Sequence, residues 1–318
     1  MEITDNCRLR QVGNDGTTTP LLVPSFSSTA FPRAAEVRTA MNLVKTHLAV
    51  SSLISAYDIH QGYLDKEVGG SDLVIIDSGN YEKSTIEGQG YPVKWTREDH
   101  KTTIGTVIPR SQVAIVNYDE PGEIAAQAED AHSFFQEYPR YSTDFLCKPL
   151  KGSTYVDVGQ IGKNLDSILK FDVLGLTEKE LGHSVLERCT NVAKLRRLLD
   201  SAGYDTPIHV FGCFEPMTVV LMCLCGADIF DGLTWTKFAV QGDSLVYTGS
   251  IPFEEGTWST DENTIRLDAA SRHLSRMTDL MLGLRSFARS HDHSALGLQN
   301  ANVDLAKAIT AQVAEKLG

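Results

Sequence analysis

The chain has 318 residues, of which 42% are hydrophobic and 22% are charged, and its formal net charge is −12. This composition excludes a disordered or fibrous protein. The negative charge argues against a surface that is basic throughout, although a local basic patch could still bind a polyanion. The length fits either one large α/β barrel with insertions or two domains.

No apolar stretch approaches the ~20 residues that a membrane-spanning helix needs. The first ten residues, MEITDNCRLR, contain no apolar segment, so we expect neither a signal peptide nor a membrane association. The six cysteines lack paired spacing, which is typical of reduced thiols rather than of a disulfide framework. We therefore predict a cytoplasmic protein.

Short apolar runs and helical segments alternate along the chain. The first run, Leu21 to Val23, is predicted to end at Pro24. Further runs, each closing on a small or acidic residue, lie at 73–77, 113–119, 172–176, 208–212 and 227–231. Helices are predicted from Pro121 to residue 138, over 185–199 with a stop at Gly203, from Glu215, and on the apolar face from Leu274 to Phe287.

Short apolar strands separated by helices indicate βαβ units and a parallel sheet that is buried on both faces. With roughly eight candidate strands, a (β/α)8 TIM barrel with insertions is favoured over an open α/β sheet. The polar stretch 83–105 is predicted to be a long loop, either a lid or a binding loop. Residues 291–318 are predicted to be a linker and a C-terminal helix, which leaves 1–290 as the barrel domain.

Three aspartates share one context, because Asp77, Asp119 and Asp231 each end an apolar run. The carboxyl ends of barrel strands form one rim, so these acids are predicted to converge on one pocket. Helix capping or a turn is the alternative for each acid. Two carboxylates facing a sugar can break a glycosidic bond through a covalent glycosyl-enzyme. A third can accept hydrogen bonds from a purine.

Several motifs resemble those of the tRNA-guanine transglycosylases. PIHVFGCFEP and GADIFDGLTWTK resemble the signature around the family's nucleophile, and DSGNYE resembles its DSGGFQ. TPLLVPSF, NYDEP, DVLGLTEKE and RHLSRMTDLMLGLR resemble its opening strand, its D-E-C-x-P turn, its GGLxxGE segment and its late HNL helix. The matches follow the family order over most of residues 16–290. The family fold is a (β/α)8 barrel, which agrees with the pattern of strands and helices.

The resemblance implies a role for each matched residue. Asp231 matches the nucleophile that attacks the ribose anomeric carbon, Asp77 matches the acid/base, and Asp119 matches the aspartate that holds the Watson–Crick edge of the purine. The other substrate-binding residues that it implies are Ser78, Tyr81 for stacking on the base, Lys151 in place of a family glutamine, and the strand end Gly175–Leu176. A lysine can donate to a purine carbonyl but cannot accept, so its charge can select a different base.

The chain departs from the family at its zinc site. No cysteine follows Cys225, and His273 matches the zinc-binding histidine without thiolate partners. We therefore expect no cofactor, with the zinc site lost and its subdomain reduced or absent. Cys223 and Cys225 are interpreted as buried small hydrophobes, and the histidines at 291 and 293 as part of the linker.

A second departure concerns nucleic-acid contacts. In TKFAVQG, Lys237 stands where the family has two arginines that grip tRNA. Fewer phosphate contacts weaken the binding of a polyanion. Around Trp95, the residues Lys94, Arg97, His100 and Lys101 are candidates for a strand-contacting lid, with a solvated surface loop as the alternative.

These features predict a nucleic-acid guanine transglycosylase that inserts a 7-deazaguanine base, with DNA slightly preferred over tRNA as substrate. One alternative is a non-catalytic partner subunit, against which the three aspartates Asp77, Asp119 and Asp231 count. The other is a TIM-barrel N-glycosidase that releases the base to water by means of the same carboxylates. A homodimer and a required partner protein both stay open.

Overall fold

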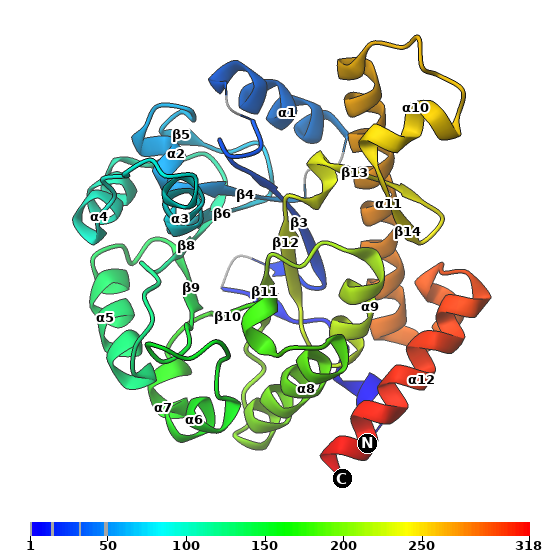
Figure 1. Ribbon diagram of the computed structural model, residues 1–318. Coiled ribbons are helices and arrows are strands. Elements are labelled where there is room, and N and C mark those ends of the chain that lie inside the picture. Colours follow the sequence, from blue (N-terminus) through cyan, green and yellow to red (C-terminus); the bar gives the residue numbers. More distant parts are fainter. Residues whose placement is uncertain (1, 14–15, 32, 48–49) are drawn as a thin grey trace.

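The structure, a computed structural model, describes residues 2–13, 16–31, 33–47 and 50–318. Within these residues, eight parallel strands close into one barrel that helices surround (Figure 1). The barrel strands are β3 (Leu21–Phe26), β4 (Ser51–Ser55), β6 (Leu73–Asp77), β8 (Gln112–Val116), β9 (Ser142–Leu146), β10 (Val173–Thr177), β11 (Ile208–Phe211) and β12 (Ile229–Gly232). Each pairs with the next barrel strand along the chain, and β12 pairs back to β3. The predicted (β/α)8 barrel is confirmed.

The apolar runs of the sequence lie on barrel strands β3, β6, β8, β10, β11 and β12. One predicted end is wrong, because β3 does not close at Pro24. The strand continues to Phe26, since Ser25 and Phe26 pair in register with Leu53 and Ile54 of β4. A proline removes one hydrogen-bond donor from the sheet but leaves its neighbours free to pair.

Strands β4 and β9 carry no apolar run, and the sequence did not single them out. Their sequences, SSLIS and STDFL, place polar side chains inside the barrel. Ser55 Oγ donates to Glu82 Oε2 at 2.8 Å, and Asp144 Oδ2 lies 2.6 Å from His209 Nδ1. Polar groups are tolerated at such depth when partners satisfy them, so hydropathy alone misses these strands.

The helices on the outside include all five that the sequence predicted, namely α5, α8, α9, α11 and the C-terminal α12. The full set is α1 (Ala34–His47), α2 (Ala56–His60), α3 (Asn80–Gly88), α4 (Arg97–Thr106), α5 (Ile124–Gln136), α6 (Val158–Lys163), α7 (Leu165–Ile168), α8 (Val185–Ser201), α9 (Pro216–Leu224), α10 (Ile251–Glu254), α11 (Glu262–Ser290) and α12 (Asn300–Leu317). Helix α5 begins at Ile124 rather than at Pro121. Glu215 caps α9 by accepting from the backbone N–H groups of Met217 and Thr218.

Among the described residues, three small strand pairs lie outside the barrel. They are β1 (Gln11–Val12) with β2 (Thr17–Thr18), β5 (Glu67–Val68) with β7 (Ile108–Pro109), and β13 (Phe238–Gln241) with β14 (Ser244–Tyr247). The last pair packs with α10 and α11 around a small separate core of Ala239, Ile251, Ile265 and Ala269. This unit follows the barrel strand that carries Asp231.

The prediction of a long loop over 83–105 is wrong. Helices α3 and α4 occupy most of this stretch, and only residues 89–96 connect them. Thr96 caps α4 by accepting from Asp99 N, and the Asp99 side chain accepts in return from the Thr96 N–H. This reciprocal cap is a helix-start signature that the polar composition concealed.

The C-terminal segment 291–318 packs onto the barrel domain. Helix α12 lies against α8 and α9 (Figure 1). Its side chains Ala306 and Val313 are fully buried and belong to the main hydrophobic core. In the parts of the chain that the structure describes, no helix combines the length and the apolar character needed to cross a membrane.

Candidate active site

A cavity of about 830 Å³ opens at the carboxyl ends of the barrel strands, and Asp77, Asp119 and Asp231 all line it. Asp77 ends β6, Asp119 follows β8 by three residues, and Asp231 lies in β12. Because parallel strands bring their carboxyl ends to one rim, acids far apart in the chain meet here. The structure thus brings together the three aspartates that the sequence predicted to converge.

Asp231 is 6% exposed, and partners hold its carboxylate from two sides. Ser25 Oγ donates to Oδ2 at 2.7 Å, and the backbone N–H of Gly212 donates to Oδ1 at 2.9 Å. Gly212 has a φ of 75°, a conformation that glycine adopts without strain. His209 Nε2 lies 3.5 Å from Oδ1. Both carboxylate oxygens are therefore oriented before any substrate arrives.

Asp77 lies in an environment that disfavours its negative charge. Burial raises the pKa of Asp77 well above its ordinary value, and the charges of Asp119, Glu82 and Asp231 raise it further. Glu82 is itself buried and accepts from Ser27 Oγ at 2.5 Å. The arrangement favours the protonated form of Asp77, which is the form that can donate a proton to a leaving group.

Asp119 is held by side chains of the DSGNYE segment. The Ser78 hydroxyl donates to Oδ1, and Asn80 Nδ2 donates to Oδ1 at 3.2 Å and to the Asp119 carbonyl at 2.8 Å. Burial raises the pKa of Asp119, while the charge of Lys148 opposes this effect. Lys148 Nζ lies 3.9 Å from Oδ2. Tyr81, from the same segment as Ser78, lines the cavity with 52% of its surface exposed.

The structure places Lys148 in the cavity, and not Lys151 as the sequence analysis predicted. Lys151 is exposed in a turn and does not line the cavity. Lys148 lines it instead, with Nζ 2.6 Å from Glu180 Oε1 and 3.3 Å from Thr177 Oγ1. The physical reason is position, because Lys148 lies two residues beyond the end of β9 whereas Lys151 lies in the turn beyond it.

Gly175 and Leu176, which the sequence analysis predicted to bind the substrate, lie away from the cavity as well. Both lie inside β10, Leu176 is fully buried, and neither lines the cavity. Residues 177–180 form this part of the wall, because β10 runs to Thr177 and the chain then turns. Gly175 serves packing, since a Cβ atom there would lie 2.6 Å from Phe211 Cε2.

The predicted strand-contacting lid around Trp95 is wrong, because its aromatic groups are buried. Trp95 is 1% exposed, and its Nε1 donates to the Ser78 carbonyl at 3.0 Å. Its buried ring therefore helps to hold the DSGNYE segment in place. His100 is fully buried. Lys94 is exposed, and Lys101 pairs with Glu137 at 2.7 Å.

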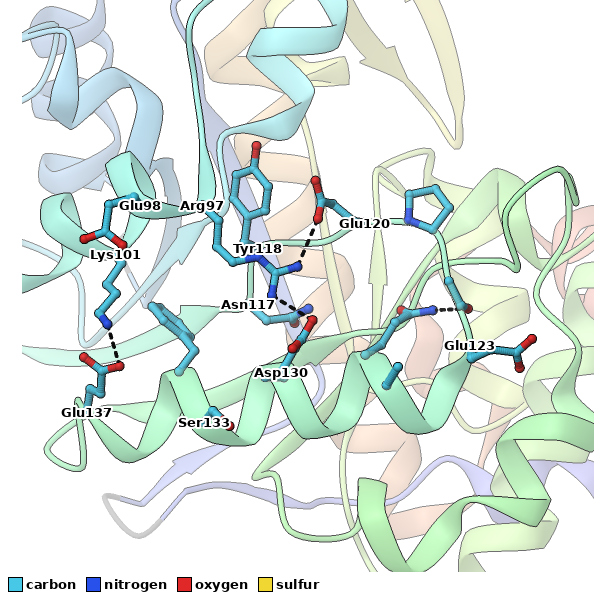
Figure 2. A pocket seen from close by; sticks show the side chains of 16 residues that line it. Arg97, Glu98, Lys101, Asn117, Tyr118, Glu120, Glu123, Asp130, Ser133 and Glu137 are labelled. Atoms are coloured by element: carbon cyan, nitrogen blue, oxygen red, sulfur yellow. Dashed lines mark hydrogen bonds and ion pairs between the residues drawn. The ribbon is translucent and has the colours of Figure 1, made fainter.

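Arg97, the remaining residue of that set, ties helices together at a second cavity of about 360 Å³ lined by residues of α4 and α5. Figure 2 shows its guanidinium between Glu120 and Asp130, at 2.9 and 2.8 Å. Glu120 directly follows Asp119 in the chain. The ion pairs therefore brace the loop that carries Asp119 rather than offering a free cation to a nucleic-acid strand.

His273, which matches the zinc-binding histidine of the tRNA-guanine transglycosylases, contacts other parts of the protein with one ring nitrogen and with the ring face. His273 Nδ1 lies 2.7 Å from the Phe238 carbonyl, and its ring stacks on Phe214. All six cysteines are buried, and Cys7 Sγ lies 3.3 Å from Cys223 Sγ. Across the described ranges, no group of three or more His, Cys, Asp or Glu side chains is arranged to hold a metal ion. Zinc needs four such ligands.

Several site residues were missed by the sequence analysis. They are Ser25, Asn80, Glu82, Lys148, Glu178, Glu180 and His209. For His209 the signal was present, because a histidine inside the apolar strand IHVFG must find polar partners. For Asn80, Lys148, Glu178 and Glu180, the position just beyond a strand end was the signal, whereas Ser25 lies inside β3 and Glu82 inside α3.

The fold and the cavity define a TIM-barrel protein whose strand ends present three converging aspartates. Comparison with known proteins adds that the family profile of queuine tRNA-ribosyltransferase matches residues 120–273. The chain is therefore similar in sequence to the tRNA-guanine transglycosylase superfamily.

Three curated relatives are described as tRNA-guanine(15) transglycosylases. The protein of Methanococcus aeolicus is 23% identical over 202 residues, covering 59% of this chain and 30% of the relative. The proteins of Methanocaldococcus jannaschii and Haloferax volcanii are 24% and 29% identical, covering 60% and 34% of this chain. These matches span 30% and 21% of the two relatives, so the chain covers less than a third of the curated proteins it resembles.

Proposed function

We propose that this protein is a base-exchange glycosyltransferase that replaces guanine in a nucleic acid with a 7-deazaguanine derivative. The observation that carries the proposal is the convergence of Asp77, Asp119 and Asp231 on one cavity. A volume of about 830 Å³ can hold a purine nucleoside. The similarity to queuine tRNA-ribosyltransferase over residues 120–273 supports the same reaction class.

In the first step, an Asp231 oxygen attacks the anomeric carbon of the guanosine sugar. The new C–O bond forms as the glycosidic C–N bond breaks, and guanine leaves with a proton from Asp77. The nucleic acid is then esterified to Asp231. In the second step, the incoming base attacks the same carbon, the Asp231 carboxylate departs, and Asp77 takes the proton that the base loses. Atoms and charges balance over the two steps.

Base recognition is assigned to Asp119, Lys148 and Tyr81. The Asp119 carboxylate accepts hydrogen bonds from purine N–H groups, and Lys148 Nζ donates to a carbonyl oxygen. Tyr81, half exposed at the rim, offers an aromatic face for stacking.

Substituting each lysine in turn tests whether Lys148 or Lys151 binds the base. We expect Lys148→Ala to raise the KM for the incoming base about 10- to 100-fold, because a hydrogen bond to a charged group contributes about 1.5–3 kcal/mol. Lys151→Ala is the matched control and should leave the KM within about threefold, since Lys151 lies outside the cavity. Steady-state kinetics with labelled base measure both. A rise of the KM in Lys151→Ala without one in Lys148→Ala would return the role to Lys151.

Exposed lysines at the cavity can bind the phosphate backbone of the nucleic acid. Lys179 and Lys237 both line the cavity and are exposed. The curated relatives are named for tRNA, which favours tRNA. The sequence favoured DNA because the zinc ligands, the zinc subdomain and two family arginines, all of them features specific to tRNA binding, are reduced or lacking, and that preference stays a prediction. Whether the protein acts as a homodimer or with a partner also stays a prediction.

The deciding experiment incubates the purified protein with radiolabelled guanine and either tRNA or DNA, both unmodified. Label that becomes acid-precipitable with one polymer identifies the substrate, and unlabelled 7-deazaguanine derivatives are then tested as competitors that chase the label out. Release of free base without incorporation would replace the proposal by an N-glycosidase. No reaction with either polymer would contradict an autonomous enzyme and favour the partner-subunit alternative.

A further inference from the structure

A second pair of polar residues lies behind Asp231, inside the barrel and away from the cavity. Asp144 of β9 and His209 of β11 are both fully buried, and His209 Nδ1 lies 2.6 Å from Asp144 Oδ2. The other ring nitrogen, Nε2, lies 3.5 Å from Asp231 Oδ1. One imidazole thus stands between two carboxylates that come from different strands.

The surroundings hold this imidazole in place. The ring of His209 stacks on Phe211, with 3.7 Å between the centroids. Gly175 leaves room for the pair, because a Cβ atom there would lie 2.9 Å from Asp144 Oδ1 and would also strike Phe211. Within the described residues, Nε2 forms no hydrogen bond, and its 3.5 Å separation from Asp231 makes their interaction one of charges rather than a good hydrogen bond.

We propose that Asp144 and His209 form a positioning dyad behind Asp231, in which a positively charged His209 attracts the Asp231 carboxylate and keeps it aligned for attack. This inference rests on the proposed function, since Asp231 is its nucleophile. His209 does not touch the substrate and acts through Asp231.

The electrostatics agree with this geometry. Burial alone lowers the pKa of a histidine, but Asp144 and Asp231 outweigh this effect and raise the pKa of His209 to about 9. The groups that face the ring are Asp144 from β9, Asp231 from β12 and the uncharged Phe211 from its own strand.

The first arm of the test uses the protein alone and needs no activity. Protein with ¹⁵N-labelled histidine is examined by NMR, and the His209 ring is assigned by its absence in His209→Gln. We expect both ring nitrogens to be protonated at pH 7.5 in the wild type, and a neutral ring in Asp144→Asn. A neutral wild-type ring at this pH would overturn the proposal.

The dyad also predicts how stability depends on pH. Because the pKa of His209 rises on folding from 6.5 to about 9, its stabilising contribution is complete below pH 6.5 and is lost as pH rises through 9. Thermal unfolding between pH 6 and pH 9.5 should show this decline in the wild type and a smaller one in His209→Gln. Identical slopes would contradict the charge assigned to His209.

The second arm measures guanine exchange between pH 5 and pH 9 in the polymer that the wild type uses. We expect His209→Gln and Asp144→Asn to lower kcat at pH 7 by about tenfold or more while the KM for the base stays within about threefold, and to remove the loss of kcat that deprotonation of His209 near pH 9 causes in the wild type. His100→Gln removes another buried imidazole and should leave the profile in place. An unchanged profile in both dyad variants of an active enzyme would overturn the dyad alone. Exchange absent from the wild type would overturn the proposed function alone, because the NMR arm still decides the dyad.

Discussion

Replacing Asp231 by asparagine is expected to abolish both guanine exchange and the covalent nucleic-acid adduct. An amide oxygen is a far weaker nucleophile than a carboxylate, so the rate should fall by a factor on the order of 10⁴ or more. The fold should persist, because the amide oxygen can still accept from Ser25 Oγ or from the Gly212 N–H. Denaturing gel electrophoresis of protein incubated with labelled polymer detects the adduct, and circular dichroism checks the fold.

A matched control for this substitution is Asp166→Asn, in which the carboxylate is exposed on α7 outside the cavity. It should form the adduct at the wild-type rate. Adduct formation by Asp231→Asn at an undiminished rate would show that another group attacks the sugar. Loss of the adduct with retained exchange would instead show a direct displacement that needs no covalent intermediate.

The second large effect is expected for Asp77→Asn, which removes the proposed proton donor. General acid–base groups contribute about 10²–10⁴-fold, so kcat should fall within this range. The loss should be greatest for guanine as the leaving base and smaller for a base analogue that departs without protonation. Single-turnover kinetics with both leaving bases measure the difference. An equal loss with the two bases would assign Asp77 a role other than proton transfer.

Stability separates this catalytic role from a structural one. Folding raises the pKa of Asp77 well above its ordinary value, so this carboxyl stabilises the fold most at low pH and loses that contribution as pH rises through its folded pKa. Asparagine carries no charge at any pH. Asp77→Asn should therefore unfold at a temperature equal to or above that of the wild type at alkaline pH, although it is far less active. A marked drop in unfolding temperature there would contradict this account.

Position relative to a strand end explains which site residues the sequence could indicate. Asp77 and Asp231 lie on barrel strands whose apolar runs mark the strand ends well, and the rim follows from parallel pairing. Lys148 and Lys151 could not be separated in the same way, because β9 has a polar sequence that hides where it stops. Because the end of β9 was not recognised, Lys151 was predicted to line the cavity in place of Lys148.

Burial of polar groups explains the other differences. Trp95 and His100 lie in a stretch whose composition is that of a surface loop, yet both side chains are buried. Trp95 lies in the connection between α3 and α4, and His100 lies in α4. Whether a polar stretch is exposed depends on what the closed fold places against it. Composition reports the average of a segment and not the direction of each side chain.

The sequence by itself determined the barrel and the meeting of Asp77, Asp119 and Asp231, because a parallel sheet buried on both faces demands apolar strands and gathers their carboxyl ends. Only the tertiary structure decided that Lys148 lines the cavity and that His209 stands between Asp144 and Asp231. Such pairings join residues far apart in the chain. These contacts form over a few ångströms, and only after the barrel has closed do the residues lie that close together.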